Sequence, residues 1–241
     1  QTIKHLGIRM YSRLAPALAE IISNAYDADA TNVVITLYEE NGIPQKIRVE
    51  DDGVGISHNE INDKFLVIGR NRRDDGGDRP SSKCSRLPTG KKGLGKLALF
   101  GLAKTITITT VQSGFKNEFV LDWDDLMAAK GTYRPKVNDV KVKTENSDGT
   151  IITLTGLKRK TAFDINTVAD NLSRLFIFEQ NFNLVLVTPK GDRISVTNER
   201  RYDQLNKEFE WNIESTLLVP SDSEYYGKMK GYLITAEKPI T

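Results

Sequence analysis

The segment EIISNAYDADA (residues 20–30) places an acid, an amide and a second acid at helical spacing. On a helix that turns about 100° per residue, Glu20, Asn24 and Asp27 point to about 0°, 40° and 340°. Apolar residues occupy the opposite side, between about 100° and 200°: Leu18, Ile21, Ile22 and Ala25. No Lys or Arg occurs from residue 14 to residue 31, so the polar side is a narrow stripe.

This stripe could activate water beside a bound cation. A carboxylate can hold and deprotonate a water molecule, and an amide oxygen four residues later can bind a hard cation such as Mg²⁺. The alternative for this segment alone is an amphipathic helix whose polar side faces solvent.

The second segment, KIRVEDDGVGI (residues 46–56), predicts a strand that runs into a turn. Apolar Ile47 and Val49 alternate with charged residues, and Gly53 and Gly55 then allow positive φ and close approach of the backbone to a ligand. A carboxylate just before such a turn, here Asp51, can accept a hydrogen bond from an exocyclic amine such as that of adenine. The alternative is an ordinary acidic turn.

The third segment, PTGKKGLGKLALFGLAKTITITT (residues 88–110), has three glycines before an apolar run of helical length. A glycine-rich loop at a helix N-terminus presents free backbone N–H groups, which suit phosphates. Three lysines add positive charge: Lys91, Lys92 and Lys96. Leu97 after Lys96 excludes a Walker loop. Taken alone, the segment could also be a flexible linker.

In this order, the segments resemble the GHKL ATPase superfamily, which includes gyrase B, the Hsp-ninety chaperones, histidine kinases and MutL. The family's N box corresponds to Glu20, Asn24, Ala25, Asp27 and Ala28. Its two glycine-bearing boxes correspond to Asp51, Gly53 and Gly55, and to Gly90, Gly93 and Gly95. A strand that opens with Gly149 and Thr150 matches the fourth element.

The resemblance implies ATP and Mg²⁺ as ligands. Glu20 would be the general base, and Asn24 would bind Mg²⁺. Asp51 would accept from the adenine amine, and Thr150 would reach the adenine through a water. Other residues implied at the nucleotide are Asp27, Gly53, Gly55, Gly90, Lys92, Gly93, Leu94, Gly95 and Lys96.

The family fold is a two-layer α/β sandwich of the Bergerat type, with a mixed, mostly antiparallel sheet and helices on one face. The alternation of β-branched residues predicts strands at 32–40, 46–51, 105–112, 117–123 and 150–157. The polar segment from about 69 to 92 would be the ATP lid.

We expect residues 1–160 to form the ATP-binding core. Residues 161–241 would extend it through a helix (164–178), two strands around a Pro-Lys-Gly-Asp turn, and two strand-like runs. This extension leads into a transducer-like domain that is cut short, which predicts an N-terminal fragment of a longer protein and argues against a histidine kinase.

Composition favours a cytoplasmic protein. The formal charge of +2 creates no strong general attraction to nucleic acid, and a single cysteine, Cys84, permits no intrachain disulfide. No apolar run is long enough to cross a membrane.

The glycine box looks like that of stand-alone bacterial members allied to MORC. We therefore expect an ATP-gated switch or clamp that forms an ATP-dependent homodimer and acts on DNA or a partner nuclease, in DNA processing or anti-phage defence. The alternative is a chaperone-like ATPase that acts on protein clients.

Overall fold

The computed structural model describes residues 13–61, 81, 83–84, 86–87, 95–129, 133, 135–179, 181–203, 206–214, 220–228 and 230–236. The chain divides into two compact units, residues 1–198 and 199–241, and each is described by itself.

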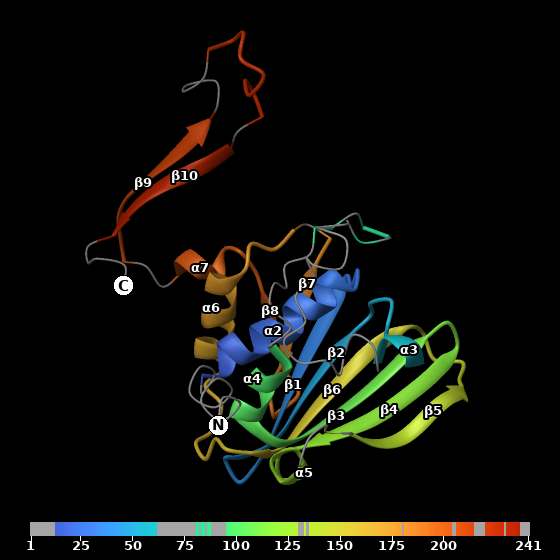
Figure 1. The fold of residues 1–241 in the computed structure, drawn as a ribbon. Helices are drawn as coiled ribbons and strands as arrows, with labels where there is room; N and C mark the ends of the chain where they lie inside the picture. Colours follow the sequence, from blue (N-terminus) through green and yellow to red (C-terminus); the bar gives the residue numbers. More distant parts are fainter. Residues whose placement is uncertain are drawn as a thin grey trace. The chain divides into compact units, whose positions relative to one another are not determined.

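The first unit is built on one eight-stranded sheet with the order β5-β4-β3-β6-β2-β1-β7-β8 (Figure 1). Among the described strand pairs of this sheet, β1 and β7 are parallel and the others are antiparallel. The strands are β1 (Asn32–Glu40), β2 (Ile43–Asp51), β3 (Ala103–Gln112), β4 (Phe115–Asp122), β5 (Lys136–Lys143), β6 (Gly149–Leu157), β7 (Asn183–Val187) and β8 (Arg193–Val196). The predicted mixed, mostly antiparallel sheet is confirmed.

Three helices, α2, α4 and α6, lie on one face of this sheet (Figure 1). The α2 helix is the central one, because it contacts both α4 and α6. Within the described residues, the helices of this unit are α2 (Leu14–Asp27), α3 (His58–Glu60), α4 (Gly95–Leu102), α5 (Trp123–Ala128) and α6 (Ile165–Leu175). The two-layer arrangement agrees with the predicted fold class.

The core lies between this helical layer and the sheet. Leu18 and Ile22 of α2 are fully buried, as are Ile35 of β1, Ile47 of β2 and Leu154 of β6. Burial of apolar side chains is the main favourable term in folding, so this layer fixes α2 on the sheet.

Two strand connections are short. Asn41 and Gly42, between β1 and β2, have φ of 51° and 74°, and Ser113 and Gly114, between β3 and β4, have φ of 53° and 77°. Two successive residues with positive φ are typical of the type I′ turn, whose twist matches that of the strands it joins.

Four strands begin one to three residues before their predicted starts; β2, for example, begins at Ile43 and not at residue 46. The structure also differs from the predicted strands in two further places. Residue Trp123, predicted as the end of a strand, instead begins α5, because the carboxylate of Asp122 accepts hydrogen bonds from the N–H groups of Asp124 (2.9 Å) and Asp125 (3.4 Å). The edge strand β5 was not predicted, since its residues are nearly all exposed and show no buried alternation.

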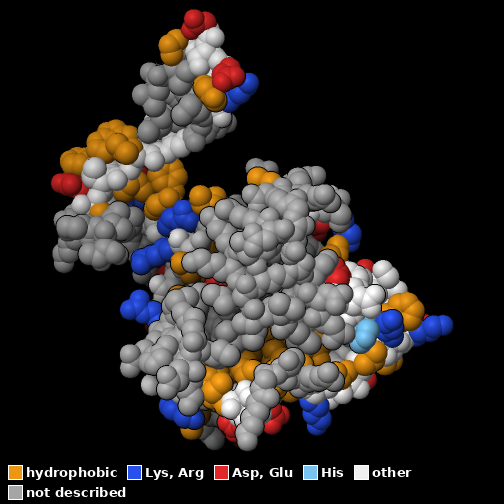
Figure 2. Space-filling view, viewed as in Figure 1, with side chains coloured by type: hydrophobic (Ala, Val, Ile, Leu, Met, Phe, Trp, Pro, Cys, Tyr) orange, Lys and Arg blue, Asp and Glu red, His pale blue; other side chains and the backbone are white. Residues whose placement is uncertain are grey.

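The second unit contains α7 (Arg200–Asp203) and a hairpin of β9 (Lys207–Glu214) and β10 (Lys230–Ala236). Hydrophobic side chains gather on its surface (Figure 2), and Phe209, Trp211 and Leu233 are about half exposed. The boundary between the two compact units falls after residue 198 in the sequence, whereas the predicted functional division at residue 160 stays a prediction.

Candidate functional site

The α2 helix separates its polar and apolar residues as its sequence predicts. Glu20, Asn24 and Asp27 are partly exposed, whereas Leu18 and Ile21 are buried. The apolar contacts therefore fix which way the acid–amide–acid stripe faces.

Asp51 ends β2 and is held by backbone donors. Its Oδ1 accepts a hydrogen bond from the N–H of Gly53 at 3.0 Å, and its side chain also interacts with the backbone of Thr150. Burial raises the pKa of Asp51 to about 6, although both backbone groups act in the opposite direction. A half-buried carboxylate with few protein donors can still accept a hydrogen bond from a ligand.

The turn after β2 lies directly against the end of α2. The N–H of Val54 donates to the carbonyl of Ala28 at 2.8 Å. A Cβ on Gly53 would lie 2.7 Å from that carbonyl oxygen and 2.9 Å from Oδ1 of Asp51. Only glycine fits this approach, which brings the stripe of α2 and the carboxylate of β2 into one neighbourhood.

The same turn contacts the start of β6 through a pair of hydroxyl groups. Oγ1 of Thr110 accepts from the N–H of Ile56 (2.9 Å) and donates to the carbonyl of Gly149 (3.2 Å). It also lies 3.2 Å from Oγ1 of the buried Thr150. Either hydroxyl can be the donor of that pair, and a hydroxyl oxygen has two lone pairs, so the buried Thr150 can still accept a hydrogen bond.

Gly55 allows this packing. It has φ of +69°, and a Cβ there would lie 1.9 Å from the carbonyl oxygen of Val111. Neither Thr110 nor Val111 was predicted at the site, because no local pattern reveals how β3 and β6 are aligned.

A second carboxylate, Asp52, was also missed. It accepts four hydrogen bonds, from the backbone N–H and side chain of both Thr31 and Asn32, at 2.7 to 2.8 Å. Burial alone would raise the pKa of Asp52, but these hydrogen bonds outweigh it and lower the pKa. Asp52 therefore ties the turn to the start of β1, and its adjacency to Asp51 was the one available sequence signal.

A comparison with known proteins decides the family. The model of the family described as histidine kinase-, DNA gyrase B-, and HSP90-like ATPase matches residues 11–150, which is more than half of the chain. The chain belongs to this GHKL ATPase family.

The chain is also similar to a protein of Herpetosiphon aurantiacus named "Putative type II restriction enzyme HgiDII". The two are 31% identical over 219 residues, which cover 87% of this chain and 33% of the relative. The chain thus spans about a third of the length of the relative it matches.

Several of the predicted nucleotide residues of this GHKL domain lie outside the described residues: Gly90, Lys92, Gly93 and Leu94. Most of the predicted lid also lies outside them. Gly95 begins α4, the helix that follows the glycine box, and Lys96 is the second residue of that helix.

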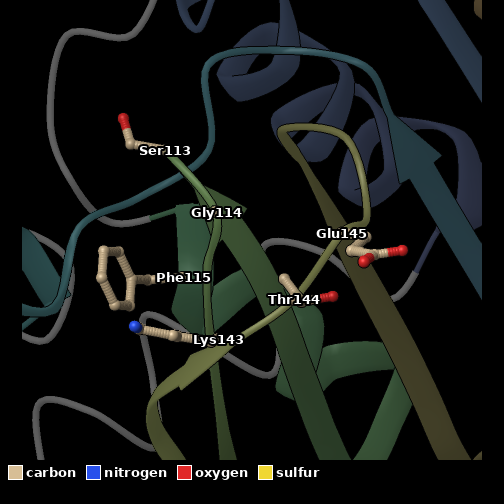
Figure 3. A pocket seen from close by; sticks show the side chains of 6 residues that line it. All are labelled: Ser113, Gly114, Phe115, Lys143, Thr144 and Glu145. Carbon is tan, nitrogen blue, oxygen red and sulfur yellow. The ribbon is translucent and has the colours of Figure 1, made fainter.

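A shallow hollow of about 540 Å³ lies elsewhere on the GHKL domain, where the β3–β4 turn meets the segment after β5 (Figure 3). Its lining residues are Ser113, Gly114, Phe115, Lys143, Thr144 and Glu145. The Phe115 ring and the Lys143 side chain extend to the same side (Figure 3). None of the predicted nucleotide residues lines this hollow.

The GHKL resemblance also implies Mg²⁺. Within the described ranges, no group of three or more His, Cys, Asp or Glu could hold a metal ion. A Mg²⁺ ion that keeps several waters and binds substrate phosphates needs only one or two protein ligands, and the partly exposed amide of Asn24 fits that role. None of the described helices is long and apolar enough to cross a membrane.

Proposed function

We propose that this GHKL domain binds and hydrolyses ATP as one module of a larger protein. The observation that carries the proposal is the contact between Val54 and Ala28, which brings the end of the acid–amide–acid helix beside the half-buried carboxylate of Asp51. Membership of an ATPase family supports the same activity.

Adenine would bind at the end of β2. The carboxylate of Asp51 would accept from the exocyclic amine, and Thr150 would contribute through a bridging water. Gly53 and Gly55 keep side chains out of the turn. The glycine box would wrap the phosphates with backbone N–H groups: Gly90, Lys92, Gly93, Leu94, Gly95 and Lys96.

Hydrolysis would begin from the stripe of α2. Glu20 would orient a water and take its proton as the water oxygen bonds to the γ-phosphorus. The bond from that phosphorus to the β,γ-bridging oxygen would break, and ADP would leave with the electron pair. Asn24 would hold Mg²⁺, which neutralises phosphate charge when bound, and Asp27 would support the site.

We further propose that ATP gates a dimerising switch or clamp that works on DNA or with a nuclease, in DNA processing or defence. The similarity to a protein named as a restriction enzyme supports this choice over a chaperone-like role, as does the MORC-like form of the glycine box. We place the protein in the cytoplasm, with residues 1–160 as the ATP-binding core and 161–241 as the extension towards a transducer-like domain. If DNA is the partner, binding should weaken steeply with salt concentration; salt-insensitive binding of unfolded protein clients would favour the chaperone role.

The first test separates binding from chemistry. Glu20→Ala should keep ATP affinity within a few-fold while lowering the hydrolysis rate by roughly 10²–10⁴, the range expected for loss of a general base. Calorimetry and phosphate release measured on the full-length protein check both parts.

Asn24→Ala is the matched variant on the same stripe, one helical turn away. It should remove the Mg²⁺ dependence of binding, because it removes the one proposed protein ligand. If Glu20→Ala hydrolysed ATP at the parent rate, the base would have to be another residue.

A further inference from the structure

A described part of the segment before the glycine box is attached to the end of α2. The carboxylate of Asp29 accepts hydrogen bonds from the N–H groups of Lys83 (2.9 Å) and Cys84 (3.2 Å). Ser81 and Arg86 close this segment, since the N–H of Ser81 donates to the carbonyl of Arg86 and the N–H of Arg86 donates to Oγ of Ser81, both at 2.8 Å.

The side chain of Arg86 is buried at the same place, with 2% of its surface exposed. Its Nη1 donates to the carbonyls of Ala30 (2.6 Å) and Tyr26 (3.3 Å). The guanidinium carbon lies 4.3 Å from the ring centre of Tyr26 and 5.6 Å from that of Phe182. Nε lies 3.9 Å from Oε2 of Glu179. A buried guanidinium persists only with such partners.

These contacts attach the segment to the C-terminal end of α2. The last turn of α2 contains no basic residue, so Arg86 supplies, from another segment, the positive charge that a helix C-terminus favours. The hydroxyl of Tyr26 donates to Oε1 of Glu179 at 2.6 Å. Burial, followed by this hydrogen bond, raises the pKa of Tyr26 to about 12, so the phenol stays protonated as a donor.

We propose that Arg86 is a positioning residue of the nucleotide site, one that holds the end of α2 against the segment leading into the glycine box. This inference rests on the proposed ATP-binding function. Asn24 lies two residues before Tyr26, and Gly90 follows four residues after Arg86. A displaced α2 would misplace Asn24 and Asp27 relative to Asp51. Even a small displacement of the groups that hold a ligand weakens their interaction with it.

The test uses Arg86→Met in the full-length protein, which removes the charge and keeps an apolar stem. We expect the Kd for a non-hydrolysable ATP analogue with Mg²⁺ to rise about tenfold, measured by calorimetry where circular dichroism shows a folded protein. Arg86→Lys keeps a cation at the helix end and should restore most of the affinity.

Arg159→Met is the matched control. Arg159 also donates to backbone carbonyls, those of Thr161 (2.7 Å) and Ala162 (2.8 Å), and lies 5.8 Å from the ring centre of Phe163. Since these contacts lie outside α2 and the segment before the glycine box, its loss should leave the Kd unchanged.

Each outcome of this experiment supports or refutes the positioning role of Arg86. If the wild-type protein binds no analogue, the proposed function fails and the role of Arg86 fails with it. If the wild type binds and Arg86→Met binds equally well with a lower melting temperature, Arg86 is structural only. Should Arg86→Met not fold, Asp29→Asn replaces it: this variant weakens the attachment of the same segment, and an unchanged Kd would overturn the positioning role.

Discussion

Two adjacent carboxylates at the end of β2 have opposite environments. The half-buried carboxyl of Asp51 accepts from the backbone of Gly53 and Thr150, and burial raises its pKa to about 6. The carboxylate oxygens of the exposed residue Asp52 accept hydrogen bonds from Thr31 and Asn32, and its pKa is lowered although partial desolvation acts in the opposite direction. Asp51 thus keeps accepting capacity for a ligand, whereas Asp52 serves the fold.

This difference predicts distinct effects for one substitution at neighbouring positions. Asp51→Asn should abolish measurable ATP binding, a loss of about 100-fold or more, because it can present a donor where the adenine amine also donates. Asp52→Asn should instead lower the free energy of unfolding by about 1–3 kcal/mol and leave affinity unchanged. Calorimetry and urea unfolding of both variants check this, and wild-type affinity in Asp51→Asn would refute the adenine assignment.

The raised pKa of Asp51 also predicts a pH dependence of stability. Between pH 4 and 6 the folded state binds more protons at Asp51 than the unfolded state does, because the pKa rises from 3.8 to about 6 on folding. The contribution of Asp51 to stability therefore falls as pH rises through this range. The unfolding free energy of wild type minus that of Asp51→Asn should decrease from pH 4 to 6. A difference that rises or stays flat would contradict the burial of this carboxyl.

At the scale of elements, the site depends on how closely the turn after β2 approaches its neighbours. Gly53 contacts the end of α2, and Gly55 contacts the end of β3. The turn therefore joins the helical layer to the sheet without side chains of its own at those two points.

Gly55→Ala should destabilise the protein far more than Gly42→Ala. Both glycines have positive φ, 69° and 74°, but a Cβ at Gly55 would lie 1.9 Å from a backbone oxygen, whereas nothing lies within 4 Å at Gly42. Gly42→Ala should cost about 1 kcal/mol for backbone strain, and Gly55→Ala at least about 3 kcal/mol because the backbone must move. Urea unfolding measures both, and equal losses would contradict the close approach.

The sequence predicted those elements whose pattern is local. The strands 32–40 and 150–157 and the two faces of α2 follow from alternation and helical spacing, and they are present. By contrast, β5 has exposed valines at 137, 140 and 142, and its pairing with β4 shifts register, which breaks the alternation. Thr110 and Arg86 were missed for another reason, since their partners lie about 40 to 60 positions away in sequence.

At the scale of the whole chain, the first compact unit includes residues well past the matched family region. β7 pairs with β1, and the buried side chains after residue 160 include Leu172, Leu184 and Leu186. β7 therefore extends the sheet beside β1, the strand that follows α2.

A chain ending at residue 198 should therefore keep a cooperative unfolding transition, whereas one ending at residue 160 should not. The shorter chain loses several buried large side chains, each contributing about 1.5–3 kcal/mol, against a total stability of about 5–15 kcal/mol. Urea unfolding followed by circular dichroism distinguishes them, and equal cooperativity would show that α6, β7 and β8 are dispensable.

The parallel pairing of β1 with β7 also governs how the protein is made. Glu20, Asn24 and Asp51 leave the ribosome before β7 (residues 183–187), the parallel neighbour of β1, is synthesised. At about 5–20 residues per second, roughly 7–30 seconds separate the two events. During that time the nascent chain carries one edge of β1 without its partner, and unpaired apolar strand edges are where aggregation begins. A low expression level in a host with ample chaperones is the condition that this topology calls for.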